Sequence, residues 1–252
     1  MCRLFAWHSP VPLTVNEALA TDADALRELS RIHQDGWGMA FDSHGEIELV
    51  RDVLAAHESP VYAKATGETK ATDGIVHLRW ATEELQVCLP NTHPFIKSGP
   101  SGPIAFCHNG GIPRGDLLNS LIDPDLIDGM EGDTDSEFYF AALITALREH
   151  DNDFVQAYRQ LLKDVDVLEY TSLNTLVLTH EKLYVLCNHK PANLPAHVNA
   201  DYYELTWTTH DGVTSAWSSG VRPHVTDGTE LGNGYLLEID RASGNTQIHH
   251  VH

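Results

Sequence analysis

The order of predicted strands and helices is the strongest constraint on the fold of this chain. Short strands joined by tight turns begin and end the sequence, and the clearest helical patterns are grouped between these two β-rich regions. A parallel sheet would instead need strands and helices in alternation, because each parallel crossover usually contains a helix. The pattern therefore predicts an α+β fold in layers, with two antiparallel sheets packed face to face and helices outside.

The first half of the chain starts with a predicted strand. Residues 2–8 form an apolar, aromatic-rich run, which is typical of a buried strand. Thr14 and Glu17 have the spacing of a capping box, and apolar residues recur after them at helical intervals. They predict a helix over about 15–33, interrupted near Thr21. Further strands are expected at 37–42, 47–52, 74–80 and 103–108.

Two helices and a β-rich segment follow in the second half. A second capping box, Thr134 to Glu137, opens the helical sequence FYFAALITALREH, and DFVQAYRQLLKDV has one apolar face. The segment from about 83 to 102 contains three prolines and is predicted to be a long loop of the kind that is usually functional. Strands are expected in LNTLVLTH, LYVLCN, YYELTWTT, VTSAWSS, GYLLEID and NTQIHHV.

Composition narrows the classes of protein that this chain can represent. The 252 residues include 16 basic and 36 acidic ones, a net charge of −20, and no basic stripe, so nucleic acid is not an expected partner. No apolar run approaches the roughly 18 residues of a membrane helix, and no signal-peptide pattern opens the chain. The four cysteines have no metal-site spacing and fit a reducing compartment. We therefore expect a single domain over residues 1–252, located in the cytoplasm.

Cys2 is placed where a chain terminus could make it reactive. Removal of Met1 would give this residue a free α-amine beside its thiol. The amine titrates at about 7.7 to 8.0 and the thiol at about 8.5, so the amine can act as a general base at neutral pH. Such a cysteine needs no separate histidine to become a nucleophile. Taken alone, it could equally be a small buried hydrophobic residue.

Five short polar motifs support a functional role for Cys2, because packing of a core does not require them. They are DGWG (35–38), HLRWAT (77–82), NTHPF (91–95), CHNGG (107–111) and GDTDSE (132–137). Together with Met1-Cys2, this ordered set resembles the class II glutamine amidotransferase family, the N-terminal-nucleophile hydrolases whose mature chains begin with cysteine. The chain is most similar to the stand-alone members, which include the γ-glutamyl hydrolase of ergothioneine synthesis, because no synthase domain follows.

The resemblance implies a four-layer αββα sandwich and a glutamine amidotransferase type-2 domain over residues 1–252. It implies that Cys2 attacks the side-chain amide of glutamine, or of a γ-glutamyl compound, and forms a thioester that water then hydrolyses. Asn109 and Gly110 would form the oxyanion hole, from a side-chain amide and a backbone N–H. No cofactor and no metal are implied.

The resemblance also assigns residues that bind the substrate. Arg79 would bind the α-carboxylate, because its planar fork donates two parallel hydrogen bonds, although an arginine taken alone is more often a surface salt bridge. Asp135 would bind the α-ammonium, although an acidic residue also stabilises the first turn of a helix. His77, His93 and His108 lack metal-site spacing and are assigned to packing and loop anchoring. Further candidates for the substrate pocket are Trp37, Trp80, Thr82 and His93; a tryptophan beside glycine is equally often part of the core.

The sequence leaves the substrate and the partner open. Glu83 and Glu84 follow HLRWAT, where the large synthase-linked members commonly have a histidine and a glycine, so the chemistry of this loop is expected to differ. One hypothesis is a self-sufficient hydrolase of glutamine or a γ-glutamyl amide. The alternatives are a glutaminase subunit that supplies ammonia to a separate synthase, and a catalytically silent binding module. A synthase partner and a homo-oligomer are both compatible with the sequence.

Overall fold

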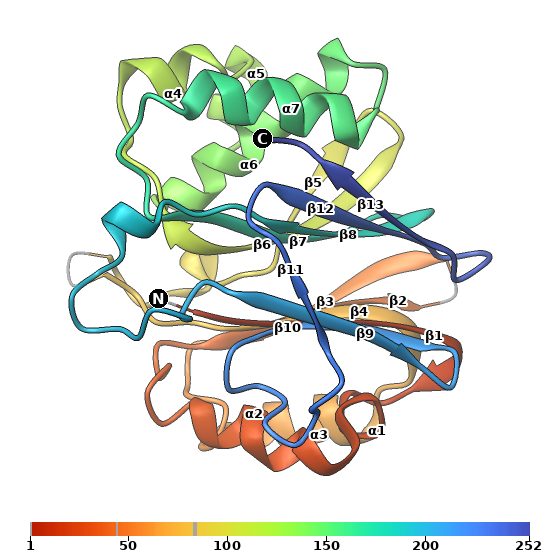
Figure 1. Ribbon diagram of the computed structural model, residues 1–252. Coiled ribbons are helices and arrows are strands. Elements are labelled where there is room, and N and C mark those ends of the chain that lie inside the picture. Colours follow the sequence, from red (N-terminus) through yellow and green to blue (C-terminus); the bar gives the residue numbers. More distant parts are fainter. Residues whose placement is uncertain (1, 44, 83–84) are drawn as a thin grey trace.

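Two antiparallel sheets face each other in the centre of the molecule, and helices cover the outer face of each sheet (Figure 1). The computed structural model describes residues 2–43, 45–82 and 85–252. The layers follow the order helix, sheet, sheet, helix. This arrangement confirms the predicted α+β fold and the four-layer αββα sandwich.

Sheet A is the lower sheet of Figure 1. Its strands are β1 (Arg3–Leu13), β2 (Trp37–Ser43), β3 (Glu46–Asp52), β4 (Ala71–Leu78), β9 (Leu205–His210), β10 (Val213–Ser218) and β11 (Thr229–Leu231). In the described part of the chain their order is β11-β9-β10-β1-β4-β2-β3, and all neighbours are antiparallel. The N-terminal strand β1 is therefore central, between β10 and β4.

Sheet B lies above sheet A. Its strands are β5 (Phe95–Gly99), β6 (Gly102–Gly111), β7 (Ser172–Leu178), β8 (Lys182–Cys187), β12 (Tyr235–Asp240) and β13 (Thr246–His250). The order within the described residues is β13-β12-β8-β7-β6-β5, again with antiparallel neighbours. The strand β6, which carries the CHNGG motif, is thus paired on both sides.

Helices from different parts of the chain cover the two sheets (Figure 1). Sheet A is covered by α1 (Val15–Leu19), α2 (Ala23–Leu29) and α3 (Pro60–Glu68), with the 3₁₀ turn η1 (Ala20–Asp22) between the first two. Sheet B is covered by α4 (Asp116–Ser120), α5 (Pro124–Asp128), α6 (Asp135–Glu149) and α7 (Phe154–Val165). Two more 3₁₀ turns are η2 (Leu89–Asn91) and η3 (Pro191–Asn193). No helix among the described residues is long and apolar enough to cross a membrane.

Alternation along β1 explains how one strand serves two apolar layers. Successive side chains of a strand point to opposite faces of the sheet. Phe5 and Trp7 pack against the helices that cover sheet A, whereas Leu4 and Ala6 pack into the layer between the sheets. That middle layer consists mainly of aliphatic side chains and small residues, so the two sheets can approach closely.

The two predicted capping boxes differ in the structure. Thr14 and Glu17 form a complete box, in which the Thr14 N–H donates to Glu17 and the Glu17 N–H donates to the Thr14 hydroxyl. At α6, Thr134 also accepts from the N–H of Glu137. The Glu137 carboxylate instead accepts from backbone N–H groups of the preceding loop and pairs with Lys97 at 2.8 Å. It therefore ties the GDTDSE loop to sheet B.

Most of the predicted elements are present, with some differences in their limits. The helix expected over 15–33 is divided near Thr21 as predicted, but α2 ends at Leu29. The strand expected within YYELTWTT begins only at Leu205. Part of the expected turn between β2 and β3, residue 44, lies outside the described residues, as do Glu83 and Glu84.

The prediction of one long loop over about 83–102 is wrong in part. This segment contains η2 and the strand β5, which pairs with β6. Its prolines and glycines argued against a strand, but β5 is a short edge strand that is stabilised by its tertiary contacts. Hydrophobic periodicity also did not predict α3, α4, α5 and β11, because elements this short contain few repeats of the pattern.

Substitution of Gly74 by alanine should destabilise the sandwich. Gly74 lies in β4 directly against the buried indole of Trp7, and a Cβ atom there would clash with the ring. We expect Gly74→Ala to lower the free energy of unfolding by about 1 to 3 kcal/mol, measured by urea denaturation. The control Gly67→Ala lies in α3 with its nearest contact 3.5 Å away, and it should be neutral or slightly stabilising. Equal stability of Gly74→Ala and the parent would contradict the packing described.

Candidate active site

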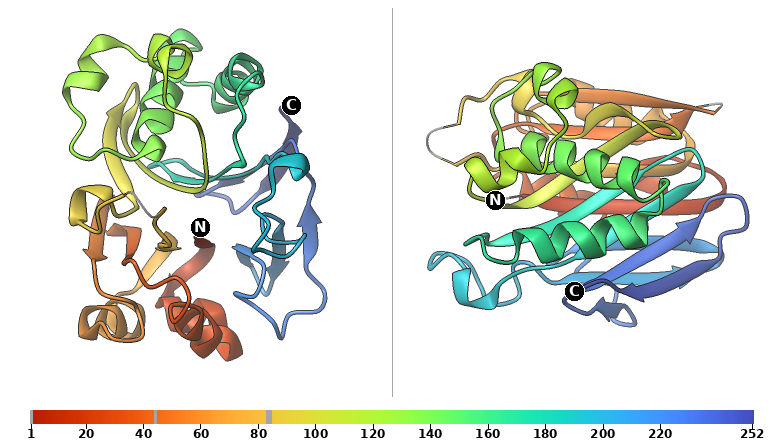
Figure 2. Two further views of the ribbon diagram at one scale, coloured as in Figure 1. Left: turned by 90° about the vertical axis from the view of Figure 1, so that its left-hand side faces the viewer. Right: turned by 90° about the horizontal axis from the view of Figure 1, so that it is seen from above.

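Cys2 lies directly before β1, at one end of the sandwich, where connecting loops of both sheets surround the start of the chain (Figure 2, left). Its backbone nitrogen donates a 2.9 Å hydrogen bond to Oδ1 of Asn109, which is in β6 of the opposite sheet. Its Sγ atom lies 3.9 Å from the carbonyl oxygen of Trp80. The residue is buried, with 8% of its surface exposed. The nucleophile candidate is therefore held between the two sheets.

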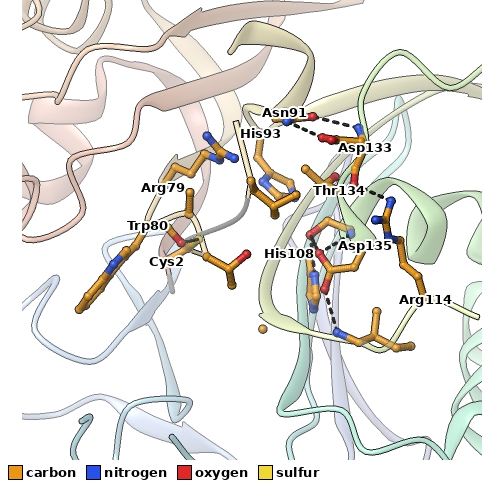
Figure 3. A pocket seen from close by; sticks show the side chains of 16 residues that line it. Cys2, Arg79, Trp80, Asn91, His93, His108, Arg114, Asp133, Thr134 and Asp135 are labelled. Carbon is orange, nitrogen blue, oxygen red and sulfur yellow. Dashed lines mark hydrogen bonds between the residues drawn. The ribbon is translucent and has the colours of Figure 1, made fainter. Parts of the chain in front are cut away.

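A cavity of about 320 Å³ opens beside Cys2. Cys2 and Arg79 lie on one side of it, and His108, Asp135 and Arg114 lie on the other (Figure 3). This volume is at the lower end of the range typical of small-molecule sites. Positive and negative side chains both line the cavity, as a zwitterionic ligand requires. The remaining lining residues are Trp80, Ala81, Thr82, Leu85, Asn91, His93, Gly110, Ile112, Asp133, Thr134 and Ser136.

Arg79 follows β4 and is almost fully buried, with 3% of its surface exposed. Its guanidinium donates to the carbonyl oxygens of Asp35 (3.4 Å) and Gln86 (3.3 Å). It forms no ion pair with a carboxylate anywhere in residues 2–43, 45–82 and 85–252. A buried guanidinium whose charge is not balanced is costly, and a ligand carboxylate in the cavity would balance it.

Asp135 is the first residue of α6 and faces the cavity (Figure 3). One carboxylate oxygen accepts a 2.8 Å hydrogen bond from the N–H of Ile112, and the other accepts a 2.9 Å bond from the N–H of Ser136. These bonds fix the orientation of the carboxylate. Oδ1 also accepts a long 3.5 Å bond from Ser136 Oγ, whereas Oδ2, which accepts from Ile112, keeps a lone pair for a further donor, because a carboxylate can accept about four hydrogen bonds.

Asn91 of the NTHPF motif joins two loops at the rim of the cavity (Figure 3). Its Nδ2 donates to Oδ1 of Asp133 at 2.7 Å, and its Oδ1 accepts from the Asp133 N–H at 3.0 Å. The NTHPF and GDTDSE motifs are therefore connected by a reciprocal pair of hydrogen bonds.

Two glycines allow close backbone approach at the site. A Cβ atom on Gly38 of DGWG would clash with the carbonyl oxygen of His93, and one on Gly110 would clash with that of Ser172. Only a residue without a side chain fits either position. The DGWG motif is thus needed to bring the NTHPF loop against sheet A.

Three buried histidines form one wall of the site and a layer behind it. The ring centroids of His77 and His93 lie 4.4 Å apart, and His108 contacts Ser136 Oγ and the Ser172 carbonyl oxygen, both at 2.9 Å. Burial, together with the nearby charge of Arg79, lowers the pKa of His77 to about 3. Burial also lowers the pKa of His93 and of His108. All three imidazoles are therefore neutral at pH 7.

The structure brings most of the predicted site residues together. Seven of them line the cavity: Cys2, Arg79, Trp80, Thr82, His93, Gly110 and Asp135. Asn109 is fully buried beneath it and contacts Cys2 through its side chain. The expectation for Trp37 needs correction, since this residue is fully buried in the core under sheet A, with its ring 4.9 Å from that of Tyr62. It lies next to two glycines because the backbone there passes close to the NTHPF loop, not because it faces a ligand.

Sequence reasoning missed several residues around Cys2. Asn91 and Asp133 stand inside motifs that the sequence offered, but no role was inferred for them. Arg114, which lines the cavity, donates to the Asp133 carbonyl oxygen at 2.8 Å and had no motif around it. Tyr202, whose hydroxyl lies 3.3 Å from the Cys2 carbonyl oxygen, is 200 residues away in the sequence and gave no signal. No group of three or more His, Cys, Asp or Glu residues in the described part of the chain could hold a metal ion.

Solved structures share this arrangement of layers. A glutamine aminotransferase class-II domain protein from Silicibacter pomeroyi matches with a TM-score of 0.63 at 18% identity, over 99% of both chains. The glutamine phosphoribosylpyrophosphate amidotransferase from B. subtilis matches with a TM-score of 0.63 at 15% identity, over 100% of this chain and 49% of that chain. At such identities the similarity shows a common fold.

The sequence comparison identifies the family. The model of the class-II glutamine amidotransferases matches residues 1–206, and the chain therefore belongs to this family. A curated relative, an uncharacterized protein of Methanocaldococcus jannaschii, is 27% identical over 173 residues, which are 66% of this chain and 46% of that protein. The match thus spans less than half the length of that relative.

The buried histidines should make the protein less stable below neutral pH. In the unfolded chain a histidine binds a proton near pH 6.5, whereas the folded state keeps these imidazoles neutral. The free energy of unfolding should therefore fall as the pH drops below about 6.5, by up to about 1.4 kcal/mol per histidine between pH 7.5 and 5.5. Urea denaturation at several pH values measures this dependence. His77→Gln should reduce the slope, and the exposed control His210→Gln should not; equal slopes in all three proteins would contradict the assignment.

Proposed function

We propose that this protein is an amidohydrolase that uses Cys2 to cleave the side-chain amide of glutamine or of a γ-glutamyl compound. Membership of the class-II glutamine amidotransferases supports amide hydrolysis in general. The observation that carries the proposal is the buried guanidinium of Arg79, which has no carboxylate partner among the described residues and shares one cavity with Cys2. We assign the α-carboxylate of the substrate to Arg79 and its α-ammonium group to Asp135.

Removal of Met1 would turn the backbone nitrogen of Cys2 into an α-amine. In the proposed reaction this amine, directly or through one water, takes the thiol proton while the sulfur attacks the side-chain carbonyl carbon. The tetrahedral intermediate then expels ammonia or an amine, which takes up the proton, and a thioester remains. Water adds to the thioester, the thiolate leaves and is reprotonated, and glutamate is released.

Asn109 and Gly110 are the proposed donors to the oxyanion of that intermediate. The Oδ1 atom of Asn109 accepts from the Cys2 nitrogen, whereas its Nδ2 atom is buried and has no hydrogen-bond partner among the described residues. An orphaned buried donor costs about 1 to 3 kcal/mol, so a transition state that supplies an acceptor would be stabilised selectively. Gly110 lines the cavity beside it.

A panel of γ-glutamyl compounds tests the proposal. Purified protein is mixed with glutamine, γ-glutamyl dipeptides and γ-glutamyl alkylamides, and the released glutamate is measured. We expect at least one compound to be hydrolysed, and Cys2→Ala to abolish the release because no thioester can form. Intact-mass measurement of the active material should show a chain that begins at Cys2. If a chain that retains Met1 is fully active, the proposed proton acceptor does not exist.

Arg79→Lys should weaken the recognition of the α-carboxylate. Lysine keeps the positive charge but cannot donate two parallel hydrogen bonds. We expect kcat/KM for the best substrate to fall by about 10- to 100-fold, mainly through KM, because one charge-assisted hydrogen bond contributes about 1.5 to 3 kcal/mol. The matched control Arg31→Lys changes an exposed residue that pairs with Glu28 and should keep the parental kinetics. A fall of the same size in the control would argue against the assignment of Arg79.

A glutaminase subunit that passes ammonia to a separate synthase is the second candidate. It is favoured by the match to the B. subtilis amidotransferase, of which this chain covers 49%. This candidate predicts weak hydrolysis of glutamine alone and stimulation by a co-purifying protein. If Cys2→Ala and the parent bind glutamine equally well and neither releases glutamate, a silent binding module remains.

A further inference from the structure

The carbonyl oxygen of Cys2 accepts two hydrogen bonds that the proposed reaction does not use. Nη1 of Arg3 donates at 3.2 Å, and the hydroxyl of Tyr202 donates at 3.3 Å. Both side chains are buried, with 9% and 4% of their surfaces exposed. Arg3 is the first residue of β1, and Tyr202 lies in the connection from η3 to β9. Segments that are 200 residues apart thus meet on one peptide group.

In the described residues, the charge of Arg3 faces an aromatic ring and has no carboxylate within ion-pair distance. Its guanidinium carbon lies 4.0 Å from the centroid of the Tyr202 ring, and its Nε atom has no hydrogen-bond partner in the described part of the chain. Among the same residues it forms no ion pair with a carboxylate. A cation over an aromatic face gains up to about 2 kcal/mol when it is desolvated, which offsets part of the cost of burial. A hydrophobic residue at position 3 would avoid that cost, so stability alone does not account for an arginine here.

The contacts of Arg3 and Tyr202 complete the fixation of Cys2. Asn109 holds its nitrogen, the Trp80 carbonyl oxygen lies near its sulfur, and the next residue, Arg3, is paired with Leu78 of β4. Residues at the end of a chain are poorly ordered unless they are tied down. The hydrogen bonds from Arg3 and Tyr202 hold the remaining polar group of Cys2, its carbonyl oxygen, and so restrict the backbone conformation from which the thiol and the nitrogen extend. Neither Arg3 nor Tyr202 lines the cavity, so they act on the reaction through Cys2.

We propose that Arg3 and Tyr202 form a clasp on the Cys2 carbonyl group and are positioning residues for this nucleophile. The inference rests on the proposed function of Cys2 and deepens it. A misplaced nucleophile lowers the rate of the chemical step, because reacting atoms must approach within about 3 to 3.5 Å in the right direction. Substrate binding through Arg79 and Asp135 is unaffected. The clasp therefore controls kcat and leaves KM unchanged.

Tyr202→Phe is the sharpest test, because it removes one hydroxyl and keeps the ring beneath the guanidinium. We expect kcat on the best γ-glutamyl substrate to fall by about 3- to 10-fold, the effect of one buried hydrogen bond, with KM changed by less than about twofold. The matched control is Tyr158→Phe, whose hydroxyl lies 2.7 Å from Thr175 Oγ1 in the core beside sheet B. This control loses a buried hydrogen bond of the same kind and should keep the parental kcat.

Two substitutions of Arg3 separate its charge from its hydrogen bond. Arg3→Met removes both and should reduce kcat more than Tyr202→Phe does. Arg3→Lys keeps the charge and one donor and should restore part of kcat. Thermal denaturation of all variants shows which of them fold. If Arg3→Met does not fold, the test rests on Tyr202→Phe.

The outcomes distinguish this inference from the proposed function. If the parent cleaves no compound of the panel, the proposed function fails, and the clasp is then judged by the alkylation rate of Cys2 with iodoacetamide, measured by mass spectrometry. That rate should differ at least about threefold between the parent and Tyr202→Phe, and not between the parent and Tyr158→Phe. If the parent is active and Tyr202→Phe has the parental kcat, or changes only KM, the clasp is refuted.

Discussion

The hydrogen bond from the Cys2 nitrogen to Asn109 is the interaction on which the arrangement of the site depends. It joins residues 107 positions apart and connects the start of β1 in sheet A to β6 in sheet B. Such a bond forms only if the two sheets stack at one spacing and one offset. Close-packed aliphatic side chains such as Leu4 and Leu176, both fully buried, set that spacing. Packing in the middle layer therefore positions Cys2 and Asn109 relative to each other at the end of the sandwich.

The electrostatics of the cavity differ from those of the whole molecule. The chain carries a net charge of −20, yet the cavity wall combines Arg79 and Arg114 with Asp133 and Asp135. The imidazoles of His77 and His93 near Arg79, and that of His108 across the cavity, are neutral, since burial lowers the pKa of each of them. They add no further positive charge to the cavity. A ligand that carries one carboxylate and one ammonium group meets a complementary field there.

The sequence predicted the layers and seven of the residues that line the cavity, and it failed where the determinants are not local. Strand alternation and capping residues are short-range signals, so the start of β1 and the limits of α6 were predicted within a few residues, whereas β1 continues to Leu13, past its expected end at residue 8. The order of the motifs suggested that Arg79, Asp135 and Gly110 belong to one substrate site, and the structure places all three on one cavity. Trp37 was misjudged because its neighbouring glycines serve backbone packing. Tyr202 was missed because no spacing links a residue to a partner at the other end of the chain.

The reciprocal hydrogen bonds between Asn91 and Asp133 have a consequence for how molecules enter the site. Two loops that are bonded to each other in this way restrain each other's motion where they line the cavity. Ligands are then selected by the outline of a preformed lining, as by a rigid sieve, more than by a gate that closes over each guest. Changes of selectivity during evolution would accordingly proceed by altering the size of side chains on that lining.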